Sequence, residues 1–303
     1  LRTVDPRPLG GGTDAPALQD AMPPALELLS QLWDVLASVF TRFSTSSQCM
    51  EKLCRCYKHT QRACGDAFQA IVPRLLPQVT GWYEQQPWSC FVYMCNACLS
   101  SFPNPRDGTP ALPAAVRPVV SEAFQRIATA TFTLLSSGAN GIVDNPDVVD
   151  DFFELCSKVL RKEPSLLLES TILQPAVQCG TAALHVQHKE AGRSTFCFFE
   201  NLIEASGPRA RTPVSPAGLA ALQGVLGEHG PKIVSQIILA VAGMLPAQRV
   251  RFLSPLLQQI VHAAPGPSRE WVTAAVRAMP AGAHADGGVL IESIFSAEAL
   301  VLD

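Results

Sequence analysis

The residues best suited to chemistry are five basic side chains within Gln48–Cys64. On a helix that turns about 100° per residue they share one arc. No acidic residue falls among them, and Glu51 lies beyond the edge of the arc. They are Lys52, Arg55, Lys58, His59 and Arg62. A row of Arg and Lys on a rigid helix can bind phosphate or carboxylate groups one after another. The pattern indicates either such a binding surface or a solvated helix face, and the residues alone favour neither.

This positive charge is concentrated within an acidic protein. The 303-residue chain has a formal net charge of −3. Ser47–Cys64 contains four Lys or Arg residues and one Glu, a net charge of +3, so the remaining residues carry −6. Since the chain has no global basic excess, direct binding to nucleic acid is not indicated. Electrostatic recognition must come from a local patch.

The basic segment needs a helix whose other face is buried. Its opposite arc is apolar and consists of Met50, Leu53, Cys54, Tyr57 and Cys64. Hydrophobic residues make up 48% of the chain, enough for a buried core,. We therefore expect Ser47–Cys64 to be an amphipathic helix packed against neighbouring helices.

Nearly everything from Pro24 onward is predicted to be helical. Gly- and Pro-rich breakers separate the apolar periodic segments, and no convincing period-two strand is present. Short joints between helices predict paired antiparallel helices. The predicted helices are Pro24–Phe43, Ser47–Cys64, Ala67–Gln85, Trp88–Ser101, Pro113–Ser136, Asp147–Lys162, Ser165–Lys189, Ser194–Ala205, Ser215–Gly227, Pro231–Leu245, Ala247–Ala263 and Ser268–Met279.

Proline recurs within these helices and suggests internal repetition. It stands at Pro73, Pro118, Pro175 and Pro255. A mid-helix proline costs roughly 3 kcal/mol, so its recurrence suggests a bent second helix in a repeated hairpin unit. Alternatively, these prolines mark helix starts. The pattern predicts an all-α, HEAT-repeat superhelical solenoid over residues 24–280, with a loop or linker at 1–23 and a divergent tail at 281–303.

The chain offers no recognisable catalytic or metal centre. Cys54 and Cys56 point to opposite sides of a helix; Cys95 and Cys98 share a face but lack the further convergent ligands of a zinc site. We interpret the ten cysteines as reduced, packed thiols of an intracellular protein,. His185 and His188 are expected on the surface near a helix end where positive charge is favoured. We predict no enzyme activity, no metal and no cofactor.

Membrane insertion is not predicted either. The most apolar stretch, Ile233–Leu245, is too short to cross a bilayer and contains Gly243,. No signal peptide is recognisable at the N-terminus, and the absence of an initial Met suggests part of a longer protein,.

Several motifs resemble one known family. They include Glu51–Tyr57 continuing to Gly65, Gln86–Tyr93, Asn145–Leu155, Ser165–Val177, Phe199–Ile203, Gly230–Gln236 and Arg269–Val272. In order and spacing they resemble the C-terminal part of transportin-3-type nuclear import receptors, in the importin-β (karyopherin-β) superfamily, with the importin-13 type as a close relative. The resemblance covers about Ala25 to Pro280.

The resemblance implies a partner for the basic segment. In this family an arginine-rich helix reads phosphorylated Arg/Ser-rich cargo such as splicing factors, and it corresponds to Gln48–Gly65. Two of the matching positions, Lys52 and Lys58, carry lysine in this chain; His59 is added from the helical arc. The resemblance further implies a HEAT superhelix around cargo, regulation by Ran-GTP through N-terminal repeats absent here, contacts with nucleoporins, and shuttling between cytoplasm and nucleus. The alternative is a HEAT-repeat scaffold or adaptor unrelated to nuclear transport.

Overall fold

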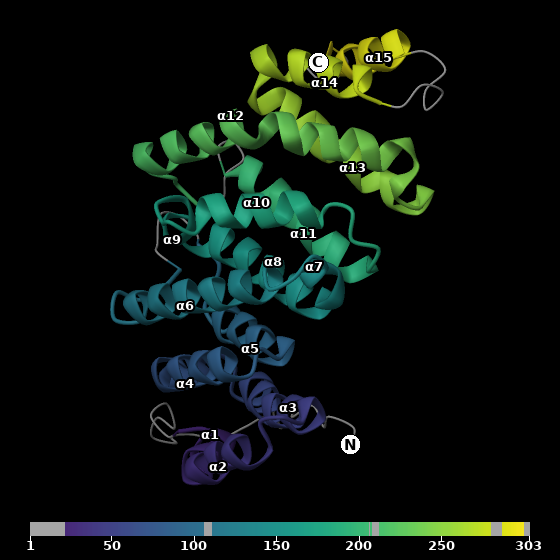
Figure 1. Ribbon diagram of the computed structural model, residues 1–303. Helices are drawn as coiled ribbons and strands as arrows, with labels where there is room; N and C mark the ends of the chain where they lie inside the picture. Colours follow the sequence, from purple (N-terminus) through teal and green to yellow (C-terminus); the bar gives the residue numbers. More distant parts are fainter. Residues whose placement is uncertain (1–21, 106–110, 206, 208–211, 280–286, 300–303) are drawn as a thin grey trace, which may run out of the picture.

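The protein is an elongated stack of helices in the computed structural model (Figure 1). The structure describes residues 22–105, 111–205, 207, 212–279 and 287–299, and no strand occurs among them. The α-helices are α1 Pro24–Gln31, α2 Trp33–Phe43, α3 Ser47–Cys64, α4 Val72–Gln85, α5 Ser89–Ser100, α6 Arg117–Leu135, α7 Gly141–Asp144, α8 Pro146–Lys162, α9 Ser165–Leu168, α10 Leu173–Ala183, α11 Lys189–Glu204, α12 Pro216–Leu239, α13 Ala247–Ala263, α14 Pro265–Arg277 and α15 Gly287–Ala299. A 3-10 helix, η1 Gly65–Ile71, precedes α4, and a π-helical turn, η2 Ala240–Met244, follows α12.

The helices form two layers. Helices α3, α5, α8, α11 and α13 pack side by side in this order, whereas α4, α6, α10, α12 and α14 form the second layer. Successive members of the two layers pair as hairpins: α4 with α5, α6 with α8, α10 with α11, and α12 with α13. The stack runs from α1 and α2 at one end to α14 and α15 at the other (Figure 1). The predicted all-α, HEAT-type solenoid is confirmed.

Aromatic side chains connect neighbouring helices in the core. In one group, Phe40 stacks on Trp82 with ring centroids 5.1 Å apart, and both rings contact Phe91. A second group links α6 to α8 and α8 to α11. Its contacts are Phe132–Phe152, Phe152–Phe153, Phe153–Phe198 and Phe198–Phe199, with centroids 5.1 to 5.4 Å apart. These rings join consecutive hairpins, as a stack of repeats requires.

Some predicted helix bounds are exact and others are wrong. The helices Ser47–Cys64 and Ala247–Ala263 have the predicted limits. The predicted helix Pro24–Phe43 is instead two helices, because a turn at Leu32 (φ −89°, ψ 4°) separates α1 from α2. Ser165–Lys189 also divides, into α9 and α10. Neither break follows a proline or glycine, so these residue types did not indicate them; at the second break the Ser170 hydroxyl accepts a hydrogen bond from the Ile172 N–H (3.2 Å).

The predicted habit of mid-helix prolines is wrong at three of four sites. Pro73 and Pro118 occupy the second positions of α4 and α6, and Pro175 the third position of α10. The first turn of a helix tolerates proline because its N–H groups have no intrahelical acceptor. Of these four prolines, only Pro255 lies in the interior of a helix, α13. The alternative that these prolines mark helix starts therefore holds for most of them.

The predicted break around Gly230 and Pro231 is also wrong. Helix α12 runs unbroken through both residues to Leu239. Apolar side chains on both halves of α12, such as Leu222 and Ile237, are fully buried, and α12 packs against both α10 and α14. That packing outweighs the cost of an interior proline.

The predicted terminal regions fall partly outside the described residues. Of the 1–23 segment, residues 1–21 are not described. In the 281–303 tail, α15 packs against α14. The Arg269 guanidinium lies 2.7 Å from the Glu292 carboxylate and stacks over Phe295. The described part of the tail thus continues the helical stack.

Candidate functional site

Helix α3 begins and ends with recognisable capping interactions. The Ser46 hydroxyl accepts a hydrogen bond from the Cys49 backbone N–H (3.4 Å) at the N-terminus. At the C-terminus Gly65 adopts φ 54°, in the left-handed region that glycine occupies at low cost,. The helix is therefore a defined segment between two local signals.

The apolar arc of α3 is buried as predicted. Met50, Leu53, Cys54 and Tyr57 are at most 4% exposed, and Cys64 is half-buried. This side packs against α1, α2 and α5. The Trp88 indole N–H, just before α5, donates to the Ser44 carbonyl (2.8 Å) and holds the segment leading into α3.

The five predicted site residues lie together on the outer side of α3, which we call the basic face. Lys52, Arg55, His59 and Arg62 are exposed, and Lys58 is half-buried. At 1.5 Å per residue the row extends about 15 Å along the helix. Within the described part of the chain, no ion pair involves Lys52, His59 or Arg62.

Two members of the basic face have intramolecular partners. The Arg55 guanidinium lies 3.5 Å from the Glu51 carboxylate, so one acidic residue does reach this surface. Both side chains are more than half exposed, and such a pair contributes little stability,. The Lys58 ammonium lies 4.5 Å from the centroid of the Tyr93 ring on α5. Lys58 is thereby fixed against the next helix of its layer.

The other residues considered from the sequence occupy structural positions. Cys95 and Cys98 are buried, and burial raises the pKa of the Cys98 thiol to about 12, which keeps it protonated,. All ten cysteines are free. His188 was expected near a helix end that favours positive charge, and this is wrong: it caps the N-terminus of α11, where its Nδ1 accepts from the Ala191 N–H (3.3 Å).

Neither a metal cluster nor a membrane-spanning helix occurs within the described residues. No cluster of three or more His, Cys, Asp or Glu side chains there has the geometry to hold a metal ion. Among those residues no helix is both long and apolar enough to cross a bilayer.

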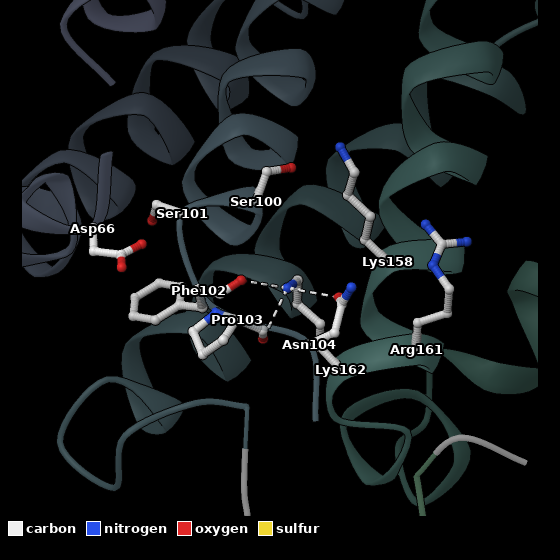
Figure 2. Close-up of a pocket in the computed structure, with 9 residues that line it drawn as sticks. All are labelled: Asp66, Ser100, Ser101, Phe102, Pro103, Asn104, Lys158, Arg161 and Lys162. Atoms are coloured by element: carbon white, nitrogen blue, oxygen red, sulfur yellow. Dashed lines mark hydrogen bonds between the residues drawn. The ribbon is translucent and has the colours of Figure 1, made fainter. Parts of the chain in front are cut away.

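A second cationic site was not predicted from the sequence. A hollow of about 430 Å³ lies between the C-terminal end of α5 and the C-terminal half of α8. Figure 2 shows its lining. We call it the α5–α8 hollow, lined by Asp66, Ser100, Ser101, Phe102, Pro103, Asn104, Lys158, Arg161 and Lys162. Lys158, Arg161 and Lys162 stand close together in the sequence, at the end of a helix. Basic residues are common at that position because they complement the helix dipole, so their spacing alone did not indicate a site.

Comparisons with known proteins agree with this architecture. Residues 23–135, which include the whole basic face, match the family model described as the Transportin-3/Importin-13 fourth TPR domain. Transportin MOS14 of Arabidopsis thaliana is 23% identical over 222 residues, covering 73% of this chain and 22% of its own length. Importin-13 of Gallus gallus is 22% identical over 227 residues, covering 75% of this chain and 22% of its own length.

The chain resembles the transportin-3/importin-13 family over residues 23–135. It spans only about a fifth of the length of these curated relatives. The family model covers transportin-3 and importin-13 together, so the narrower transportin-3 assignment stays a prediction. A solved structure of importin-13 in its cytosolic state superposes on 92% of this chain with a TM-score of 0.73, at 14% identity and over 30% of that chain. That likeness supports the solenoid fold alone.

Proposed function

We propose that this chain is the cargo-binding part of a nuclear import receptor. In this proposal the basic face of α3 binds phosphorylated Arg/Ser-rich segments of cargo proteins through Lys52, Arg55, Lys58, His59 and Arg62. The supporting observation is the row of exposed cations on one capped helix, inside the region that matches the transportin-3/importin-13 family model.

The spacing of the basic face suits a peptide with phosphoserine at alternate positions. Cations three or four residues apart on a helix are separated by about 4.5–6 Å along its axis. Alternate residues of an extended peptide are separated by roughly 7 Å. A phosphoserine carries a charge of about −1.5 to −2 at pH 7. Successive phosphates can therefore meet successive cations, Arg55 and Arg62 as bidentate donors and the lysines as point charges.

The wider transport cycle is part of the same proposal. The resemblance to transportin-3 and importin-13 supports Ran-GTP and nucleoporins as further partners, Ran mainly through repeats outside this chain, and shuttling between cytoplasm and nucleus. Direct nucleic-acid binding is not proposed, since the chain as a whole is acidic,. The family match does not favour the alternative of a scaffold unrelated to nuclear transport.

The deciding experiment compares phosphorylated and unphosphorylated Arg/Ser peptides by fluorescence anisotropy. We expect binding of the phosphorylated peptide only, weakening as salt is raised because the cations are exposed. Arg55→Glu combined with Arg62→Glu should abolish it. A matched control reverses the same number of charges elsewhere, at the exposed residues Lys232 and Arg277. Equal binding of both peptides, or equal loss in the control, contradicts the proposed site.

A further inference from the structure

The α5–α8 hollow contains a buried cation without a charged partner. Lys162 is only 6% exposed. Its ammonium donates to the Phe102 carbonyl (2.6 Å), the Pro103 carbonyl (3.1 Å) and the Asn104 side-chain oxygen (3.3 Å). Within the described part of the chain, no carboxylate forms an ion pair with it. Three neutral oxygens satisfy its hydrogen bonds but leave its charge unneutralised.

Two further cations line the same hollow. Lys158 pairs with Glu154 at 2.8 Å and also lies 3.4 Å from the Asn96 carbonyl. The Arg161 guanidinium donates to the neutral Asn201 side-chain oxygen (3.3 Å). Figure 2 shows Lys158 and Arg161 extending in the same direction from α8, with Ser100 of α5 beside Lys158 and Asp66 on the far side. Of the residues that line the hollow, these three are cationic and Asp66 is acidic.

Burial lowers the pKa of Lys162 to about 8, and the positive charges of Lys158 and Arg161 add to this lowering. The three cations thus repel one another within the site. A bound anion would relieve that repulsion.

The hollow and the basic face both involve α5, the hollow through Ser100 and the basic face through Tyr93. Helices α3, α5 and α8 are consecutive members of one layer. Lys58 of α3 contacts Tyr93, and Lys158 of α8 contacts the Asn96 carbonyl, one turn further along α5. Asp66, which lines the hollow, lies two residues after the end of α3. Two interhelical steps of about 8–10 Å separate α3 from α8, a span that roughly five or six residues of extended peptide would cover.

We propose that the α5–α8 hollow is a second phosphate subsite, which binds a phosphoserine five or six residues away from those that bind α3 in the same cargo segment. This inference rests on the proposed function of α3. Arg161 supplies the directional hydrogen bonds, Lys158 an ammonium at the rim, and Lys162 a buried positive charge beneath. A phosphate suits the three cations better than a carboxylate because it carries nearly twice the charge and three strong acceptor oxygens.

The test uses the full chain and four fluorescent peptides. One carries only the Arg/Ser phosphoserine cluster that α3 would bind. Three longer peptides add six residues ending in phosphoserine, glutamate or unmodified serine. We expect the added phosphoserine to tighten binding about tenfold, and Lys158→Gln combined with Arg161→Gln to remove that gain while leaving the short peptide unaffected. Should that variant fail to fold, Ser100→Asp at an exposed position beside Lys158 should remove the same gain.

The outcomes separate the two proposals. Suppose that the short peptide binds and that the α3 variant weakens its binding. The second subsite is overturned if the added phosphoserine does not raise the affinity, or if the raised affinity persists in both hollow variants. An equal gain from glutamate overturns the assignment to phosphate. If the short peptide does not bind, the proposed function fails. The hollow is then tested in the chain that carries Arg55→Glu and Arg62→Glu. If the long phosphorylated peptide binds this variant more tightly than the long unmodified peptide does, the hollow binds phosphate by itself; equal binding overturns it.

Discussion

The Lys58 ammonium lies over the ring of Tyr93, 4.5 Å from its centroid, and joins α3 to α5. The contact crosses from one hairpin to the next. It holds a flexible, half-buried side chain in one orientation within the basic face. Lys58 is therefore already partly ordered in the free protein, so it loses less conformational entropy when a ligand binds.

Removing this ring should weaken phosphopeptide binding without unfolding the protein. A cation–π contact at such a site is worth about 0.5–1 kcal/mol, so Tyr93→Leu is expected to weaken binding roughly two- to fivefold. Tyr93→Phe keeps the ring and should bind as the wild type does. Anisotropy titrations of both variants provide the measurement. Equal affinities for Leu and Phe at this position would show that the ring does not orient Lys58.

Lys162 should produce a distinctive pH dependence of stability. Burial lowers its pKa to about 8, whereas the unfolded chain keeps the ordinary value of 10.5. The unfolded state therefore binds more protons between these pH values, so the contribution of Lys162 to stability increases as pH rises from 8 to 10.5. The increase amounts to about 1.4 kcal/mol per pH unit at most. At pH 7 the Lys162→Met variant should be less stable than the wild type by about 1–3 kcal/mol, because the buried carbonyls of Phe102 and Pro103 lose their hydrogen-bond donor,.

Urea denaturation at pH 7, 8.5 and 10 tests this expectation. The stability difference between wild type and Lys162→Met should widen with pH. Lys232→Met, at an exposed lysine on α12, is the matched control. Parallel curves for wild type and Lys162→Met would contradict the assigned environment of the ammonium.

Asp151 should have the opposite dependence on pH. Burial, with the nearby carboxylates of Asp150, Glu154 and Asp147, raises its pKa to about 8 from an ordinary value of 3.8. The folded state holds this proton while the unfolded state has released it, so stability is lost as pH rises from about 4 to 8. At pH 8 the Asp151→Asn variant should therefore be more stable than the wild type by about 1–3 kcal/mol.

Thermal or urea unfolding from pH 5 to 8 provides the comparison for Asp151. The exposed Asp34, on α2, supplies a control in Asp34→Asn. An Asp151→Asn protein whose stability falls with pH as steeply as that of the wild type would refute the prediction.

Gly230 permits a close approach between α12 and α14. A Cβ atom built on Gly230 would lie 2.4 Å from the Trp271 ring. Gly230→Ala should force that partly buried ring to shift and destabilise the protein by about 1–3 kcal/mol. Gly224 and Gly227 on the same helix have no atom within 4 Å of the corresponding position. Alanine there should stabilise by up to about 1 kcal/mol, since it is the better helix former. Similar unfolding midpoints for all three variants would show that Trp271 does not oppose a side chain at position 230.

The sequence predicted α3 well because its signals are local. Ser46, Gly65 and the apolar arc around Leu53 all lie within or beside the helix, and its limits were exact. The basic face could be predicted for the same reason. The contact of Lys58 with Tyr93 could not, because helical periodicity does not specify which helix lies alongside.

Other features depend on residues far apart in the chain. Lys162 interacts with residues 58 to 60 positions earlier, so the neighbouring basic residues of α8 could not by themselves indicate the α5–α8 hollow. The continuity of α12 through Pro231 depends on packing against α10 and α14, which outweighs the local preference for a break,. The early prolines Pro73 and Pro118 were misplaced because helix starts are hard to locate within an apolar run,.

The arrangement of the aromatic groups has a mechanical consequence. Among the described residues, ring contacts connect Phe40, Trp82 and Phe91, and again Phe132 to Phe199, but no aromatic pair crosses from α5 to α8. Polar contacts contribute to that crossing instead, including Asn96 to the Asp151 carbonyl (2.9 Å). Interlocked rings resist small rotations, whereas hydrogen bonds adjust to them. We therefore expect neighbouring hairpins to rotate slightly against each other at the α5–α8 crossing, where no aromatic pair interlocks the described helices.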